Sequence, residues 1–152
     1  MAITIRPLCD DADREACYAL RMEVFVEEQG VPPSEELDAD DETAAHFLVE
    51  DPGQVVGTAR LVDKGDGVGK IGRVAIQRAY RGRGIGRDLM RYVMDEGFQR
   101  VHTLILDAQL QVIPFYEKLG FEAEGEIFLD AGIKHRRMTC AEGAGASHGR
   151  SR

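Results

Sequence analysis

A run of alternating glycines and arginines, Arg81-Gly82-Arg83-Gly84-Ile85-Gly86, has the composition of a phosphate-binding turn. Glycines let the backbone adopt conformations in which several N–H groups point into one concavity. A helix is expected directly after the run, and the positive end of its dipole would add to the attraction for an anion. Arg81, Arg83 and Arg87 bring positive side chains to the same place. We therefore expect a phosphate or pyrophosphate group to bind here.

The spacing of the glycines distinguishes between phosphate-binding motifs. A Walker A loop ends in Gly-Lys-Ser/Thr, and no lysine follows these glycines. A dinucleotide fingerprint that begins at Gly82 would need its third glycine at the position of Arg87. The pattern that fits is Arg/Gln-x-x-Gly-x-Gly/Ala, formed by Arg81, Gly84 and Gly86. A glycine-rich connection that binds nothing is the alternative.

The loop must be held between a strand and a helix. Residues 70–76 are apolar and strand-like, and residues 87–98 repeat apolar side chains at helical spacing. A first helix should begin at Asp10, with Asp13 three residues later as in a capping box. Residues 33–43 read as an acidic loop, and the apolar strand 103–108 should be buried on both faces. Other strands are expected over 3–5, 46–50, 55–62, 121–128 and 133–139, and a short helix over 112–119.

The chain's length and composition indicate a globular protein. Its 152 residues fit one domain, which we place over residues 1–140, followed by a small, polar and disordered tail over 141–152. No apolar run is long enough for a membrane span, and the first residues lack a signal-peptide pattern. Cys9, Cys17 and Cys140 show neither a disulfide framework nor metal-ligand spacing. We expect a cytoplasmic protein without a metal.

Charge is distributed unevenly along the chain. A net charge of −8 argues against general nucleic-acid binding. Between Asp10 and Asp51 there are fifteen acidic residues against Arg14 and Arg21. Between 73 and 91 there are six arginines against one aspartate. One part of the surface should attract anions and another cations, although the acidic run also fits a simply solvated face.

A second motif joins the glycine run in a resemblance to the GCN5-related N-acetyltransferases, the GNAT superfamily. The run matches that family's acyl-CoA pyrophosphate loop. The segment Phe115-Tyr116-Glu117-Lys118-Leu119-Gly120-Phe121 is similar to the family's Φ-Tyr-x-x-x-Gly-Phe on its last helix. The resemblance covers residues 3–140 and extends to the ElaA-like subgroup. The residues that carry this closer similarity are 21–29, Glu36, Asp38, His46, 59–61, 71–74, 107–109 and 132–135.

The resemblance implies a fold and a cofactor. The fold would be α/β, with a mixed, mostly antiparallel sheet that is splayed at its centre and has helices on both faces. The splay would lie between strands 70–76 and 103–108. Acetyl-CoA would be the co-substrate, with its pantetheine arm paired to the backbone of Val74, Ala75 and Ile76. Its other contacts would be Arg81, Gly82, Arg83, Gly84, Ile85, Gly86, Arg87 and Gln109, the last standing where many members have Asn.

The resemblance also implies a reaction. An acetyl group would pass directly from the thioester to a primary amine within a ternary complex. The leaving thiolate gains from a proton donor, and Tyr116 matches the family's acid at that position. The amine must lose its proton before it attacks, and the base is open between carboxylates, histidines and water. Candidate contacts to a small-molecule or peptide amine are Glu28, Asp38, His46, Arg73 and His135.

Other interpretations remain open at this point. Arg21, Arg60 and Arg73 lie in or beside apolar stretches, so each needs a carboxylate partner if it is buried, and Asp38 or Asp41 could supply one. Acyl-homoserine-lactone synthases have a comparable arrangement of arginines and acids, but they do not need so complete a CoA loop. A non-catalytic acyl-CoA-binding module is the third possibility. A homodimer is compatible with each of them.

Overall fold

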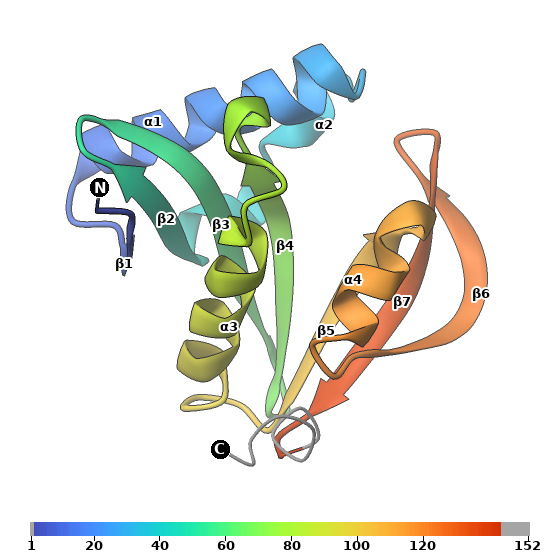
Figure 1. The fold of residues 1–152 in the computed structure, drawn as a ribbon. Helices are drawn as coiled ribbons and strands as arrows, with labels where there is room; N and C mark the ends of the chain where they lie inside the picture. The colour runs from blue at the N-terminus through green and yellow to red at the C-terminus, as the bar shows by residue number, and fades with distance from the viewer. Residues whose placement is uncertain (1, 144–152) are drawn as a thin grey trace. The chain divides into compact units, whose positions relative to one another are not determined.

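Across residues 2–143, the part of the chain that the computed structural model describes, seven strands form one sheet in the order β1-β2-β3-β4-β5-β7-β6 (Figure 1). β1–β2, β2–β3, β5–β7 and β6–β7 pair antiparallel, whereas β4–β5 pair parallel. The expected mixed, mostly antiparallel sheet is therefore confirmed. The strands are β1 Thr4–Pro7, β2 Ala45–Asp51, β3 Gln54–Gly65, β4 Val68–Ile76, β5 Thr103–Gln109, β6 Glu122–Asp130 and β7 Ile133–Ala141.

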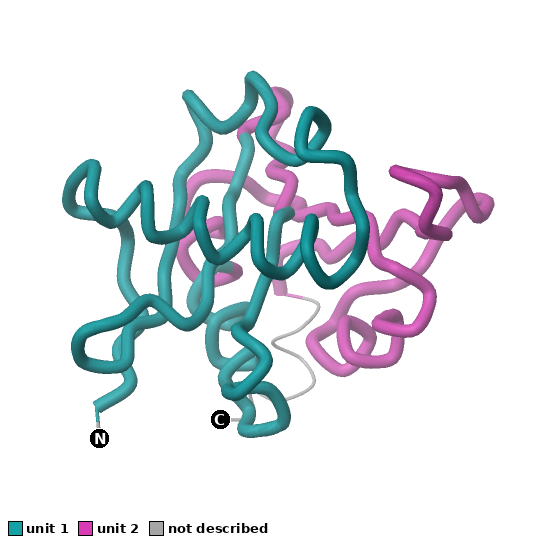
Figure 2. The backbone as a smooth tube through the Cα atoms, turned by 90° about the horizontal axis from the view of Figure 1, so that it is seen from above, with its two compact units in different colours: residues 1–62, 72–93 teal, residues 63–71, 94–152 magenta. Residues whose placement is uncertain are grey.

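The chain divides into two compact units, shown in different colours in Figure 2. Of the described residues, unit 1 holds 2–62 together with 72–93, and unit 2 holds 63–71 together with 94–143. The assignment of residues 1–140 to one domain stays a prediction. Of the expected tail, Ala141 is the last residue of β7, and 144–152 lie outside the described residues.

Helical segments connect the strands. The first helix begins where the sequence indicates, because the Asp10 side chain accepts a hydrogen bond from the Asp13 amide at 2.9 Å. No helix within residues 2–143 has the length and apolarity to cross a membrane. The α-helices are α1 Asp11–Arg21, α2 Pro33–Glu36, α3 Ile85–Gly97 and α4 Ile113–Glu117. A π-helix covers Met22–Glu28, and 3₁₀ turns cover Ala39–Glu42, Arg78–Tyr80 and Leu110–Val112.

The expected acidic loop over 33–43 is wrong, because α2 and a 3₁₀ turn occupy most of it. Pro33 stands at the start of α2, where its fixed φ is already helical and its missing N–H costs nothing. Asp38 and Asp41 then form a reciprocal capping box around the 3₁₀ turn. The residues that form this capping box are acidic. A prediction from acidic composition alone therefore missed the turn.

In unit 1, helices cover both faces of the sheet. Side chains of successive strand residues point to opposite faces. On β2, His46 packs edge-on against Tyr18 of α1, with ring centroids 5.9 Å apart. The next residue, Phe47, packs against Tyr92 of α3 at 5.8 Å. α1 and α3 therefore lie on opposite sides of β2.

In unit 2, β5 lies beside β7, and α4 packs against β5 and β6. The expectation that 103–108 is buried on both faces is wrong. Leu104, Leu106 and Ala108 are buried, while the residues between them are only half-buried. Asp107 explains the difference, because its carboxylate pairs with Lys70 at 3.0 Å and with Arg137 at 2.6 Å, both partly exposed side chains.

Close packing at Gly57 predicts that a single methyl group will destabilise unit 1. A Cβ at Gly57 would lie 2.8 Å from Val49 Cγ2, nearer than real Cβ atoms approach, and 3.0 Å from Ile76 Cδ1, a tight contact. We expect Gly57→Ala to lower the free energy of unfolding by about 1–3 kcal/mol, measured by urea denaturation. Gly72→Ala is the matched control, because its nearest neighbour would be Arg60 Nε at 4.0 Å. Equal stability of the two variants would contradict the packing argument.

Candidate functional site

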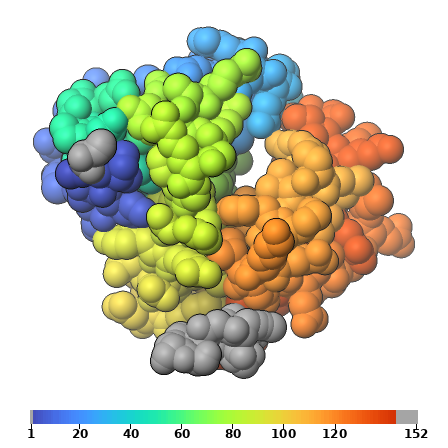
Figure 3. All heavy atoms as spheres, in the orientation of Figure 1, coloured from blue at the N-terminus to red at the C-terminus, as the bar shows by residue number. Residues whose placement is uncertain are grey.

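The glycine loop has the backbone geometry of an anion-binding turn. Gly82 and Gly84 have φ of 77° and 81°, which a side chain would disfavour. No heavy atom lies within 4 Å of a Cβ built at Gly82. α3 starts at Ile85, so the unpaired N–H groups of its first turn lie in the loop. The chain around residue 80 lies at the molecular surface (Figure 3).

The three loop arginines have different partners. Arg81 Nε donates to the carbonyl of Ile76 at 2.8 Å, and its Nη2 donates to Glu28 Oε1 at 2.7 Å. The Arg83 guanidinium lies over the Tyr80 ring, 4.9 Å from its centroid. Arg87 is exposed and lies 3.5 Å from the Asp88 carboxylate. Arg83 and Arg87 are thus held only by weak surface contacts, whereas Arg81 is fixed at two points.

The end of β4 that precedes the loop is anchored in the core of unit 1. Ala75 is buried in a cluster with Leu20 and Val24, while Val74 and Ile76 are half-buried. Arg73, just before them, has φ of 52°, a strained conformation for a residue with a side chain. Arg73 Nη2 donates to the Glu36 carbonyl at 2.9 Å and to Asp38 Oδ2 at 3.2 Å. These bonds help to hold the strained backbone in place.

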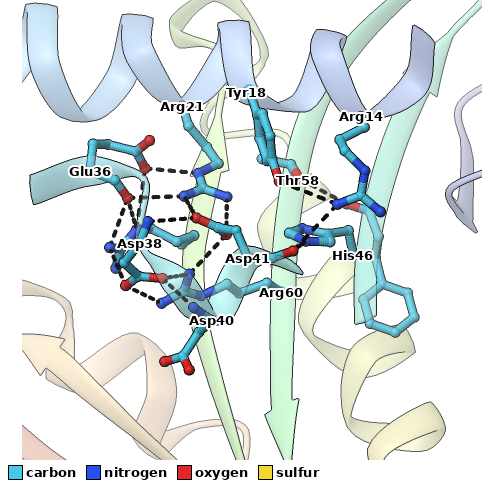
Figure 4. A network of polar contacts seen from close by, with 12 residues as sticks. Arg14, Tyr18, Arg21, Glu36, Asp38, Asp40, Asp41, His46, Thr58 and Arg60 are labelled. Atoms are coloured by element: carbon cyan, nitrogen blue, oxygen red, sulfur yellow. Dashed lines mark hydrogen bonds and ion pairs between the residues drawn. The ribbon is translucent and has the colours of Figure 1, made fainter. Parts of the chain in front are cut away.

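A charge network connects α1, the 33–43 segment and β3 (Figure 4). Arg21 is 1% exposed, and its Nε donates to Glu36 Oε2 at 2.8 Å. Its Nη1 donates to Asp41 Oδ1 at 2.8 Å, and its Nη2 donates to Asp41 Oδ2 at 3.1 Å. Because a guanidinium and a carboxylate can bond side by side, this pairing compensates the burial of both charges.

Arg60 extends the network from β3. Its Nη1 donates to Asp38 Oδ1 at 2.7 Å and to Asp41 Oδ1 at 2.8 Å. The sequence-based expectation that Asp38 or Asp41 partners the buried arginines is therefore met by both. Within residues 2–143 two buried atoms of the network, Glu36 Oε1 and Arg60 Nε, make no hydrogen bond.

The network fixes the ionisation of its aspartates. Burial by itself would raise the pKa of Asp41, but hydrogen bonds from Arg21, the Asp38 amide and Arg60 hold that pKa well below its usual range. The hydrogen bond from Arg60 likewise lowers the pKa of Asp38. Both side chains are ionised at neutral pH and are engaged with guanidinium groups.

His46 belongs to the same structural region. The ring is 5% exposed and its Nε2 lies 2.9 Å from the Asp41 carbonyl, which can only accept, so Nε2 carries the proton. Burial lowers the pKa of His46 and keeps the ring neutral. His46 is thus a neutral histidine packed in the core of unit 1.

The candidate acid lies in unit 2. Tyr116 sits on α4, with its ring packed edge-on against Phe115 and Phe121. Burial raises the pKa of Tyr116 to about 12. Within residues 2–143 its hydroxyl makes no hydrogen bond, so the proton is not committed to another group. Gln109, at the end of β5, accepts a hydrogen bond from Gln111 at 2.8 Å.

His135 also lies in unit 2. The half-buried ring stacks on Phe128 with an interplanar angle of 22°, and its Nδ1 is 2.7 Å from the Ile133 carbonyl. Its second nitrogen, Nε2, is the one that could meet a substrate.

The contact between Glu28 and Arg81 was missed by sequence reasoning. The two residues are 53 positions apart, and both belong to unit 1. The sequence indicated an acceptor contact for Glu28 and a phosphate contact for Arg81, without relating them. No local pattern carries such a pairing, so only the structure could supply it.

The central position of Asp41 predicts a large loss of stability when its charge is removed. Asp41→Asn would remove the one carboxylate that Arg21 and Arg60 share and leave each with a single charged partner, at a cost of about 3–5 kcal/mol in the free energy of unfolding. Asp40→Asn is the control, because the Asp40 carboxylate points away from the network (Figure 4). Urea denaturation of both variants measures the difference, and equal losses would contradict the role of Asp41.

The lowered pKa values of Asp41 and Asp38 predict acid sensitivity. Their stabilisation is complete above the ordinary aspartate pKa of about 3.9, and it is lost as the pH falls through the lower values of the folded state. We expect the melting temperature of the wild type to fall steeply below about pH 4. Asp41→Asn should show a shallower fall, because its group no longer titrates. Parallel curves for the two proteins would rule out Asp41 as a source of the acid transition.

Comparison with known proteins matches most of the chain to one family. The acetyltransferase (GNAT) family profile matches residues 14–121. The uncharacterised N-acetyltransferase YjcF of Bacillus subtilis is 39% identical over 130 residues, which cover 82% of this chain and 89% of YjcF.

Solved structures agree with this comparison. An acyl-CoA N-acyltransferase from Pseudomonas aeruginosa has a TM-score of 0.81 at 29% identity, covering 93% of this chain and 100% of its own. Escherichia coli ElaA has a TM-score of 0.81 at 26% identity, covering 91% and 98%. With the sheet order and the loop that opens α3, these similarities show that the chain belongs to the GNAT family of acetyltransferases.

Proposed function

We propose that the protein is an acetyl-CoA-dependent N-acetyltransferase that moves an acetyl group to a primary amine by direct transfer in a ternary complex. The observation that carries this proposal is the Arg81–Arg87 loop at the start of α3, with two left-handed glycines in an exposed turn. The Pseudomonas aeruginosa structure, an acyl-CoA N-acyltransferase by name, supports the choice of an acyl-CoA donor.

The loop fits the pyrophosphate of CoA. A pyrophosphate needs several N–H donors and positive charge at close range, and the backbone can approach it only where side chains are absent. Gly82 leaves such a space, and the first turn of α3 supplies donors. Arg83 and Arg87 can turn towards the phosphates at little cost, since their present contacts are weak and exposed. Backbone groups of Val74, Ala75 and Ile76 on the preceding strand would pair with the pantetheine arm.

Tyr116 would act as the general acid. When the neutral amine attacks the thioester carbonyl, a C–N bond forms and the C–S bond breaks, which leaves a thiolate. The phenol O–H of Tyr116 would protonate that thiolate, and the amine's proton would pass to solvent. A pKa of about 12 keeps the phenol protonated across the physiological range.

The acceptor would be a small-molecule or peptide amine. Asp38, His46 and Arg73 are engaged in the buried network, so they would act on the acceptor only by shaping the 33–43 segment. Glu28 and His135 are half-buried and lie outside that network. They are the better candidates for direct contact.

Removing the Tyr116 hydroxyl tests the proposed acid. We expect Tyr116→Phe to lower kcat by about 10²–10⁴-fold, with little change in the Kd for CoA, because only the protonation of the thiolate is lost. Tyr92→Phe is the matched control, since the Tyr92 ring packs against Phe47 in unit 1. Equal turnover of wild type and Tyr116→Phe at every pH would exclude this role.

Turnover itself is tested with a panel of primary amines. Thiol release from acetyl-CoA that depends on an added amine would support the transferase. CoA should also raise the melting temperature, corresponding to about 2.7 kcal/mol at a concentration 100 times its Kd. Thermal protection without turnover on any amine would favour a binding module instead.

A further inference from the structure

The Glu28 carboxylate forms an ion pair with Arg81 of the glycine loop. Glu28 Oε1 lies 2.7 Å from Arg81 Nη2 and 3.8 Å from Arg78 Nη2. The Glu28 side chain is 17% exposed and that of Arg81 is 41% exposed, so the pair is partly shielded from water. Within residues 2–143 the Glu28 carboxylate forms ion pairs with these two guanidinium groups.

The rest of the Arg81 side chain is also fixed. Its Nε donates to the Ile76 carbonyl at 2.8 Å, which ties the guanidinium to the end of β4. Glu28 is the last residue of the π-helix Met22–Glu28, so the ion pair joins that helix to the loop. The Arg81 guanidinium is therefore held in one orientation beside the loop, and its positive charge is paired with the Glu28 carboxylate.

A carboxylate and a phosphate present similar oxygen acceptors to a guanidinium. A pyrophosphate in the loop would either take Arg81 from Glu28 or sit beside the Glu28 carboxylate. In the first case Glu28 competes for the same donor, and in the second it repels a like charge. In both cases the negative charge of Glu28 lowers the affinity of the loop for pyrophosphate.

We propose that Glu28 is an internal competitor of the CoA pyrophosphate for Arg81, and that it sets the affinity of the loop. This inference rests on the proposed function, because it requires the loop to be the pyrophosphate site. Glu28 thus has a role on the donor side, in addition to any contact with the acceptor. Its removal should tighten the binding of CoA, whereas loss of a merely structural ion pair would leave binding unchanged or weaken it.

The test is titration calorimetry with CoA and, separately, with inorganic pyrophosphate. We expect Glu28→Gln to lower both Kd values by about two- to fivefold. The gain should shrink at high salt, because it is electrostatic. Glu27→Gln removes the same charge from the exposed neighbouring residue and should leave both Kd values within experimental error.

Arg81→Gln makes the experiment specific to the pair. It should weaken binding, and the double variant Glu28→Gln with Arg81→Gln should bind like Arg81→Gln alone. A Glu28→Gln protein that binds CoA no more tightly than wild type overturns the inference, and so does a gain that persists without Arg81. Thermal unfolding checks that each variant is folded. If Glu28→Gln does not fold, Glu28→Asp retracts the carboxylate by one methylene and should show a smaller gain.

Failure of the inference can be told apart from failure of the proposed function. If neither wild type nor Glu28→Gln binds CoA or pyrophosphate, the loop is not a pyrophosphate site and both proposals fall. If wild type binds both ligands and Glu28→Gln gives no gain, only the competition is wrong.

Discussion

Buried guanidinium groups that need carboxylate partners determine how unit 1 is organised. Arg21 on α1 and Arg60 on β3 both bond to Asp41, and each has a second carboxylate partner, Glu36 for Arg21 and Asp38 for Arg60. The segment after the π-helix folds into α2 and a 3₁₀ turn, and this path brings Glu36, Asp38 and Asp41 to the arginines. A stretch that would otherwise be solvated thereby becomes part of the core.

The same constraint reaches the candidate cofactor site through β4. Arg73 takes a left-handed conformation whose side chain is held by the Glu36 carbonyl and Asp38. The strand then continues to Ile76, whose carbonyl receives Arg81 from the glycine loop. Within unit 1, β4 therefore connects the buried charge network to the glycine loop by hydrogen bonds at Arg73 and at Ile76. This is why substitutions far from the loop can be expected to alter its geometry.

Local signals in the sequence were sufficient for much of the fold. The Asp10 cap, the glycine loop before α3 and the hairpin strands depend on neighbouring residues, and their patterns are legible. Features set by distant partners were not. The polar Asp107 in an apolar strand forms ion pairs with Lys70 and Arg137. Glu28 accepts a hydrogen bond from Arg81, which lies 53 positions later in the chain. For the candidate site, the loop and Tyr116 are predictions from motifs, whereas the contacts of Asp38 and His46 within unit 1 are visible only in the structure.

Pairing inside unit 1 also changes what an approaching ion meets. A few acids of the 10–51 segment lie at contact distance from arginines of the 73–91 segment, as in the pairs Asp38–Arg73 and Glu28–Arg81. Closely spaced opposite charges produce fields that decay much faster with distance than those of isolated charges. An amine in solution is therefore guided less by long-range attraction than the acidic run suggests. Selection of the proposed amine acceptor would then depend more on short-range contacts than on the acidic run as a whole.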